Sequence, residues 1–286
     1  MTRIVLAYDG SIHADWVGRY AVRLAGASGS GLEVLHVDDG ASMAGVVESR
    51  LAHLREIAAK SSVDVSLRQL ALPPAGGVAG ALHAAVPPDA GCIIVSGLRA
   101  RESGRGLLRG TVSERLLRSG HHDVLAIRVV SPSLLGHARH VLLSLSENPD
   151  AARRAALFLR LFASDLASLS LLTVVSPRLG RLASPTGADL RSLRARGMQH
   201  LSQVESQLRG ALAPFEIPFD AQVSVAWDWS TEVTQFAART RPDLVLLGST
   251  ERTLASRFVF GNPLERALRD AVCDVAIFRR AQGARR

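Results

Sequence analysis

The hydrophobic and polar residues of this chain follow two alternating patterns. Short, continuously apolar runs such as 4–8, 92–95 and 244–247 are typical of strands that are covered on both faces. Between such runs, apolar residues recur three and four positions apart, as in Val46, Val47, Leu51, Leu54 and Ile57, which is the spacing of a helix with one buried face. This alternation predicts an α/β fold, a doubly wound parallel sheet with helices on both faces.

The pattern predicts the same series of elements in each half of the chain. In the first half we expect strands over 4–8, 32–38, 63–72, 92–97 and 123–130, with helices starting near 12 and over 43–60, 78–86 and 111–119. In the second half we expect strands over 140–145, 169–175, 219–226, 244–248 and 274–279, with helices over 151–163, from about 186 to 213, 231–238 and 263–270.

The second half repeats the first in a constant register. Two pairs of corresponding residues are 137 positions apart and two are 151 apart: Asp9 with Ser146 and Val37 with Val174, then Gly97 with Gly248 and Gly110 with Gly261. The extra residues fall mainly in the long helix before position 213. We therefore interpret the chain as a tandem duplication, with domains at 1–131 and 138–282 joined by a linker that contains Pro132 and Gly136.

Composition narrows the class of protein. The 286 residues are 47% hydrophobic and 21% charged, which suits a globular protein, and no run approaches the ~18 apolar residues of a membrane helix. The N-terminal segment reaches Asp9 too early for a signal peptide, so a cytoplasmic location is expected. Cys92 and Cys273 are predicted to be inert core thiols, and no metal-binding motif is present.

The net charge of +8 comes from arginine, since Lys60 is the one lysine. The arginines are spread over both halves and aromatic residues make up only 5%, which argues against a nucleic-acid-binding protein. Lys60 is far from any glycine-rich loop, and no Gly-x-Ser-x-Gly sequence occurs. We therefore predict no catalytic residues.

The strongest candidate site is the stretch 97–114. A buried strand opens there into a loop rich in glycine and arginine, which closes on a helix start, the layout in which backbone N–H groups hold phosphate. Thr111 with Glu114 predicts a capping box at that start. The loop's basic residues suit polyphosphate, or else form a solvated surface: Arg99, Arg101, Arg105 and Arg109.

Residues at the carboxyl ends of three strands should converge on this loop. Ligands of open parallel sheets bind beyond those ends, and Asp9, Val37 and Gly97 each lie at one. Asp9 could accept a hydrogen bond from a sugar hydroxyl or a base amino group, and Val37 could present its backbone to a purine edge. Ser113 would donate its hydroxyl to a phosphate.

With these motifs, the chain resembles the universal stress protein family, specifically its tandem members. Gly97-x2-Ala100-x9-Gly110-Thr111 keeps the spacing of the family's G-x2-G-x9-G-S/T motif, and the segments 4–11, 35–37 and 123–128 are similar to its first, second and last strands. The resemblance implies five-stranded parallel sheets in the order 3-2-1-4-5. It also implies pairing of the two domains, or of two chains, through the last strand.

The same resemblance implies a function. A stress-related regulatory protein is expected, binding ATP, ADP or AMP with or without Mg²⁺ and acting on an unidentified protein partner. By this resemblance its enzymatic activity would be, at most, slow ATP hydrolysis. The implied nucleotide-binding residues are Ala7, Tyr8, Asp9, Val37, Gly97, Ala100, Arg101, Gly110, Thr111, Val112 and Ser113.

Departures from the motif leave an alternative open. Ala100 replaces the family's second glycine, so we expect weakened binding. In the second half, Glu251 would repel phosphate, Pro263 removes an N–H donor and Ser146 replaces the aspartate, so this domain is expected to be degenerate. The alternative is a nucleotide-independent interaction scaffold in which both clefts are relics.

Overall fold

The computed structural model describes residues 2–40, 44–88, 91–98, 108, 110–177, 186–249 and 262–282. The chain divides into two compact units, Met1–His137 with Ala276–Arg286, and Ala138–Val275. Within the described residues, no helix is long and apolar enough to cross a membrane.

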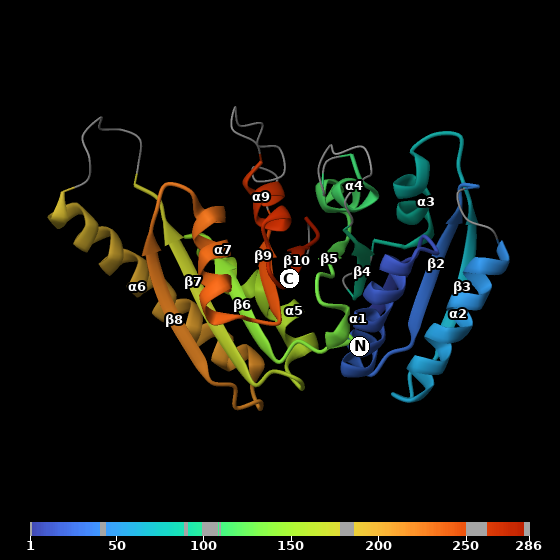
Figure 1. Ribbon diagram of the computed structural model, residues 1–286, viewed down its shortest axis with the longest axis horizontal. Coiled ribbons are helices and arrows are strands. Elements are labelled where there is room, and N and C mark those ends of the chain that lie inside the picture. Colours follow the sequence, from blue (N-terminus) through green and yellow to red (C-terminus); the bar gives the residue numbers. More distant parts are fainter. Residues whose placement is uncertain are drawn as a thin grey trace. The chain divides into compact units, whose positions relative to one another are not determined.

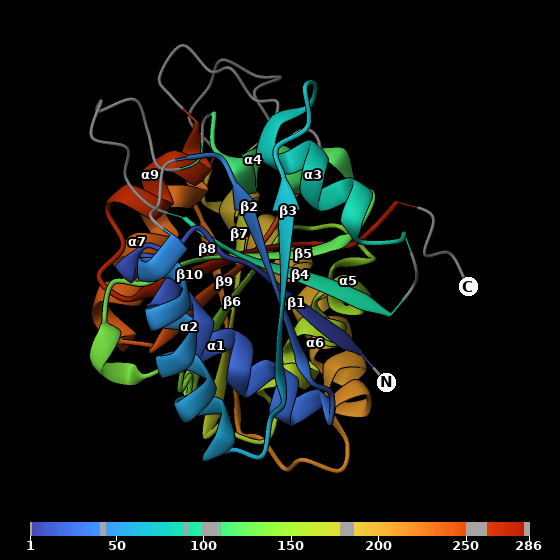
Figure 2. The ribbon, with the colours of Figure 1, turned by 90° about the vertical axis from the view of Figure 1, so that its right-hand side faces the viewer.

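The first unit is a parallel α/β domain with the strand order β3-β2-β1-β4-β5, which confirms the order expected from the sequence. Its strands are β1 (Arg3–Ala7), β2 (Leu32–Asp38), β3 (Val65–Ala71), β4 (Cys92–Gly97) and β5 (Asp123–Arg128). Its helices are α1 (Ile12–Ser28), α2 (Ala44–Ala59), α3 (Gly77–Ala85) and α4 (Val112–Ser119). Figure 2 shows α1 and α2 on one side of the strands and α3 and α4 on the other.

The strand register places the carboxyl ends of β1, β2 and β4, where the expected site residues lie, at the same end of the sheet. Ala7, the last residue of β1, pairs with Leu35 of β2 and with Ser96 of β4. Residues 4–6 and 93–95 are fully buried, because helices cover both faces of the sheet, as their continuous hydrophobicity predicted. In Figure 1, α3 and α4 lie at this carboxyl end of the first unit's strands.

Local hydrogen bonds fix where the site-forming helices begin. The Ser11 hydroxyl accepts from the Ala14 N–H at 3.2 Å and caps α1. The Thr111 hydroxyl accepts from the Glu114 N–H at 3.0 Å and caps α4, and Gly120 ends α4 in the left-handed conformation with φ +65°. The polar caps therefore hold both helix N-termini next to the strand ends.

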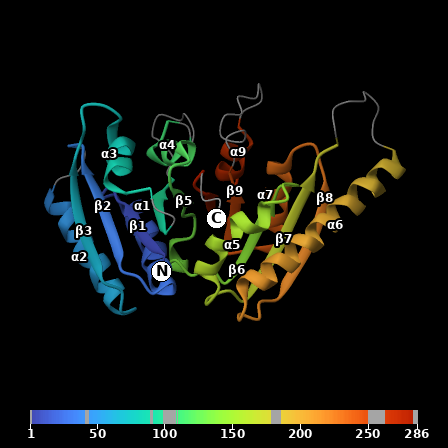
Figure 3. The ribbon, with the colours of Figure 1, turned by 180° about the vertical axis from the view of Figure 1, so that it is seen from behind.

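The second unit has the same architecture. Its strands are β6 (His140–Leu145), β7 (Ser168–Val175), β8 (Phe219–Val225), β9 (Leu244–Gly248) and the start of β10 (Asp274–Arg279), in the order β8-β7-β6-β9-β10. Its helices are α5 (Ala151–Phe162), α6 (Gly187–Leu212), α7 (Trp229–Thr240) and α9 (Pro263–Arg269). Figure 3 shows α5 and α6 over one face of β6, β7 and β8. The 26-residue α6 contains most of the insertion inferred from the two offsets.

The last residues of the chain belong to the first unit, although the sequence placed 138–282 together in the second domain. Asp123, at the start of β5, accepts hydrogen bonds from Arg280 Nε at 2.9 Å and from the Ala281 N–H at 2.8 Å. Gln282 N–H donates to the Gly120 carbonyl at 2.7 Å. These bonds attach the C-terminal segment to the first unit. A short 3₁₀ turn, Pro132–Leu134, follows β5 in the chain.

Candidate functional site

A cavity of about 480 Å³ opens at the carboxyl end of the first unit's strands. Nine of the eleven residues expected at the site line it: Ala7, Tyr8, Asp9, Val37, Gly97, Gly110, Thr111, Val112 and Ser113. Ala100 and Arg101 lie outside the described residues, as do Arg99, Arg105 and Arg109. The volume falls within the range of small-molecule sites.

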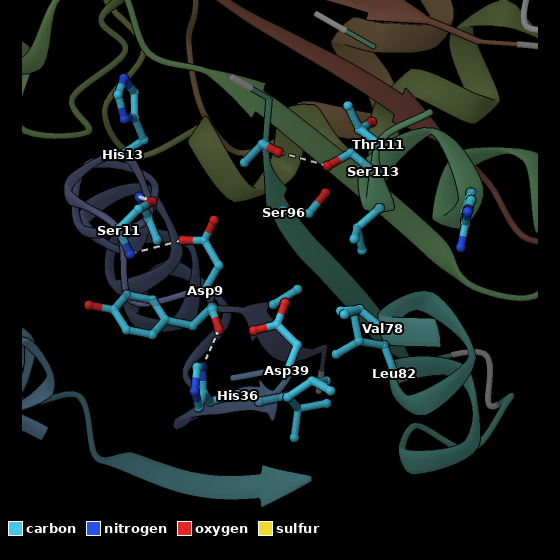
Figure 4. A pocket seen from close by; sticks show the side chains of 18 of the residues that line it. Asp9, Ser11, His13, His36, Asp39, Val78, Leu82, Ser96, Thr111 and Ser113 are labelled. Atoms are coloured by element: carbon cyan, nitrogen blue, oxygen red, sulfur yellow. Dashed lines mark hydrogen bonds between the residues drawn. The ribbon is translucent and has the colours of Figure 1, made fainter. Parts of the chain in front are cut away.

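One wall of the cavity is formed by the ends of β1 and β2. The Asp9 carboxylate accepts from the Ser11 N–H at 3.0 Å, and Figure 4 shows it on the same side as Asp39. His36 Nδ1 donates to the Tyr8 carbonyl at 2.9 Å. Two carboxylates thus lie at this wall, where they can accept hydrogen bonds from hydroxyl or amino groups of a ligand.

The Tyr8 side chain is committed to the fold. Its hydroxyl donates to Asp15 of α1, whose other oxygen accepts from Arg50 of α2. Burial raises the pKa of the Tyr8 phenol far above its usual value, and the hydrogen bond and negative charge of Asp15 raise it further. The phenol therefore stays protonated and ties the end of β1 to α1, although Tyr8 itself also lines the cavity.

The opposite wall is formed by the end of β4 and the start of α4. Ser113 is 2% exposed, and its hydroxyl donates to the Gly97 carbonyl at 2.7 Å. The Thr111 hydroxyl donates to the Leu108 carbonyl at 2.6 Å while accepting from Glu114. Both hydroxyl protons therefore have acceptors inside the protein, and Figure 4 shows Thr111 and Ser113 side by side above β4.

Glu114 closes the helix start differently from a standard capping box. Its Oε2 accepts from the Gly110 N–H at 2.6 Å, one residue before the N-cap, rather than from the Thr111 N–H. The Thr111 N–H instead donates to the Leu108 carbonyl at 3.1 Å. A carboxylate of the protein itself thus binds an N–H group that the sequence assigned to phosphate.

Ser96 is the polar residue of the cavity floor that the sequence did not reveal. It lies on β4 next to Ala7 and Ala126, lines the cavity and is 2% exposed. Within the described part of the chain its hydroxyl has no hydrogen-bond partner. A buried hydroxyl without a partner is costly, so its place at a cavity points to a polar ligand.

Helix α3 and the body of α4 complete the cavity. Val78 and Leu82 of α3 form an apolar wall, and Arg115 of α4 adds a cationic side chain. Ser11, His13, Ala14, Leu35, His36 and Asp39 also line it without having been predicted as site residues. No sequence pattern singles out Val78, Leu82 or Arg115, because contacts between α3 and α4 depend on tertiary packing.

Corresponding residues of the second unit have a different chemistry. Ser96 corresponds to Leu247 and Ser113 to Leu264, both buried and both apolar. Asn262 caps α9 by accepting from the Leu264 N–H at 3.0 Å, and Pro263 occupies the first helical turn. Glu251 and Gly261 lie outside the described residues.

The described residues contain no group of three or more histidine, cysteine, aspartate or glutamate side chains that could hold a metal ion. Cys92 and Cys273 are both buried free thiols. Burial raises the pKa of Cys273 to about 12, as do the charges of Asp274 and Asp243, so this thiol is unreactive at neutral pH.

Two tandem α/β units, each with the order 3-2-1-4-5, define a doubly wound parallel fold, and the cavity of the first unit lies at the carboxyl ends of its strands. The Universal stress protein family matches the chain over residues 1–87 and 137–279. The chain belongs to this family. The matched residues exclude 88–136, the part of the first unit that contains the stretch 97–114.

Solved structures show the same fold. A universal stress protein from Archaeoglobus fulgidus is 16% identical with a TM-score of 0.62, covering 98% of this chain and 97% of its own. A putative universal stress protein from Pseudomonas aeruginosa is 15% identical with a TM-score of 0.58, covering 96% and 92%. The cytoplasmic domain of a prokaryotic cation chloride cotransporter is 13% identical with a TM-score of 0.61, covering 98% and 96%. No curated protein matches the chain significantly.

Proposed function

We propose that the first unit binds an adenine nucleotide, ATP, ADP or AMP with or without Mg²⁺, and that the chain is a cytoplasmic regulatory protein of the stress response. The observation that carries this proposal is the cavity at the strand ends. Its walls combine apolar, carboxylate and backbone N–H groups around the unsatisfied hydroxyl of Ser96.

The chemistry of the two walls suits the two ends of a nucleotide. Leu35, Val37 and Leu82 offer an apolar surface for a purine ring, and the Asp9 carboxylate can accept from a ribose hydroxyl or the base amino group. The start of α4 directs backbone N–H groups and the positive end of its dipole toward the phosphates.

Binding in this mode requires one local change. Glu114 already accepts from the Gly110 N–H, so a phosphate at that group displaces the carboxylate. This contact favours the second candidate function, an interaction scaffold that binds no nucleotide. In that case Glu114 is the permanent partner of Gly110.

We assign nucleotide binding to the first unit only. Leu247 and Leu264 stand where Ser96 and Ser113 stand in the first unit, and Ser146 replaces Asp9. The second unit then serves as a structural partner. Pairing of the two domains, or of two chains, through their last strands remains part of this proposal.

Native mass spectrometry of gently purified protein separates the two candidates. We expect a bound mass equal to AMP, ADP or ATP, one per chain, which is lost in Ser96→Leu because the larger side chain fills the cavity floor as Leu247 does in the second unit. Leu247→Ser is the matched control and should keep the ligand. Protein that carries no nucleotide, even after incubation with millimolar ATP, would be a scaffold.

A further inference from the structure

Arg115 projects from α4 at the edge of the cavity. It is the one arginine or lysine that lines the cavity within the part of the chain that the structure describes. No ion pair joins it to a carboxylate of any described residue. It lies close to the start of α3, since a Cβ at Gly77 would be 3.4 Å from Arg115 Nη1.

The second unit contains a copy of this arginine in a different state. Arg266 of α9, 151 positions after Arg115, forms an ion pair with the Asp228 carboxylate. Asp228 is the N-cap of α7 and also accepts from the Ser230 N–H at 3.1 Å and from the hydroxyls of Ser230 and Thr231, each at 2.7 Å. The arginine and the start of the neighbouring helix thus hold one anionic group between them.

Electrostatics confirm that this arrangement is suited to an anion. Burial alone would raise the pKa of Asp228, but the hydrogen bonds from Thr231 and Ser230 and the charge of Arg266 outweigh burial and lower it. The carboxylate therefore stays ionised in contact with Arg266.

The first unit lacks this carboxylate. The N-cap of α3 is Gly76, which makes no side-chain capping bond, and the next residue is Gly77. Among the described residues, the α3 N-terminus therefore supplies no carboxylate to Arg115 where Asp228 supplies one to Arg266. The cavity lies beside it, since Val78 of α3 and Arg115 both line the cavity.

We propose that Arg115 binds a phosphate group of the nucleotide, in the place where Arg266 binds the Asp228 carboxylate in the second unit. This inference rests on the proposed function of the first unit. It also explains the asymmetry of the two units, because an arginine neutralised by its own chain is not free to bind an exogenous phosphate.

Calorimetric titration of the full chain with ATP tests this role. Arg115→Gln should weaken ATP binding at least about tenfold, the effect expected for loss of one charge-assisted hydrogen bond. The matched control Arg266→Gln should leave ATP affinity unchanged. Because Arg115 is exposed, its replacement leaves the core intact.

A second pair of variants tests the charge without touching Arg115. Gly77→Asp places a carboxylate beside Arg115, as Asp228 lies beside Arg266, and should weaken ATP binding as Arg115→Gln does. Gly77→Asn introduces a side chain of the same shape as aspartate but without its charge, at the same position with its left-handed φ of +59°. This variant should bind ATP nearly as the wild type does.

The outcomes separate the inference from the function on which it rests. Wild-type protein that binds no ATP contradicts the proposed function, and the role of Arg115 falls with it. Wild-type binding with equal ATP affinity in Arg115→Gln overturns the role of Arg115 alone, and so does an equal loss in Gly77→Asp and Gly77→Asn.

Discussion

At the scale of single residues, two buried hydroxyl groups have no hydrogen-bond partner in the described part of the chain. Ser96 lines the cavity of the first unit, whereas Thr173 of β7 is fully buried and is not among the cavity-lining residues. An unsatisfied buried hydroxyl costs about 1–3 kcal/mol. Substitutions at these two positions can therefore distinguish the loss of a ligand contact from a purely structural effect.

Ser96→Ala should raise the free energy of unfolding of the ligand-free protein by about 1 kcal/mol, because it removes the unsatisfied hydroxyl. The same substitution should weaken ATP binding several-fold. Thr173→Val, the control, should stabilise by a similar amount and leave binding unchanged. Chemical denaturation and calorimetry measure the two effects, and full affinity in Ser96→Ala would show that the hydroxyl does not contact the ligand.

His83 of α3 predicts a pH dependence of stability. Its ring lies 5.4 Å from that of His121 and 5.2 Å from that of His122, in the turn before β5. Burial, and to a lesser extent the charges of His122 and His121, lower the pKa of His83 to about 4. Between pH 6.5 and 4 the unfolded chain therefore binds a proton at His83 that the folded chain does not bind.

Stability should accordingly fall as the pH is lowered through this window. His83→Gln removes the titrating group, so its melting temperature should decrease less than that of the wild type between pH 7 and pH 4.5. Thermal unfolding at both pH values measures the difference. Parallel curves for the two proteins would mean that His83 does not contribute.

At the scale of elements, we expect the two aspartate N-caps of the second unit to contribute unequally to the free energy of unfolding. Asp228 binds two residues of α7 and Arg266 of α9, whereas Asp150, the N-cap of α5, makes no side-chain capping bond. Asp228→Ala should lower the free energy of unfolding by about 1–2 kcal/mol, and Asp150→Ala by much less. Denaturant titrations of the two variants decide this, and equal losses would contradict the clamping of α7 to α9.

The sequence predicted most elements because their signals are local. The expected helix over 43–60 corresponds to α2 at Ala44–Ala59, and the expected strand over 63–72 to β3 at Val65–Ala71. Thr111 was correctly predicted as a cap. The helix expected over 231–238 is longer in the structure, because α7 spans Trp229–Thr240.

The parts of the site that the sequence missed depend on contacts between distant elements. Ser96 was one residue of an apolar strand run, and nothing in that run shows that its side chain meets a cavity. Arg115 had no distinguishing neighbour in sequence, since its environment is set by Gly77 of α3. The contact of Glu114 with Gly110 depends on the geometry of the loop end.

At the scale of the whole molecule, the C-terminal segment completes the first unit. Asp123 is 4% exposed and accepts from Arg280 and from the Ala281 N–H. Removing these donors leaves the buried Asp123 carboxylate without two of its hydrogen bonds, which should lower the free energy of unfolding by about 3 kcal/mol.

Truncation after Arg279 should therefore lower the melting temperature markedly. Truncation after Gln282, which keeps both donors and the bond from Gln282 to Gly120, should leave it unchanged. Differential scanning calorimetry compares the two. Equal melting temperatures would show that the segment 280–282 does not stabilise the first unit.

The asymmetry between the two units is the central feature of the molecule. The first unit offers a cavity with Asp9, Ser96 and Arg115, while the second has leucines in place of Ser96 and Ser113 and an arginine neutralised by Asp228. Calorimetric titration of the full chain with ATP measures this asymmetry directly. We predict one binding site per chain; no heat at high micromolar protein, or two equivalent sites, would contradict the account.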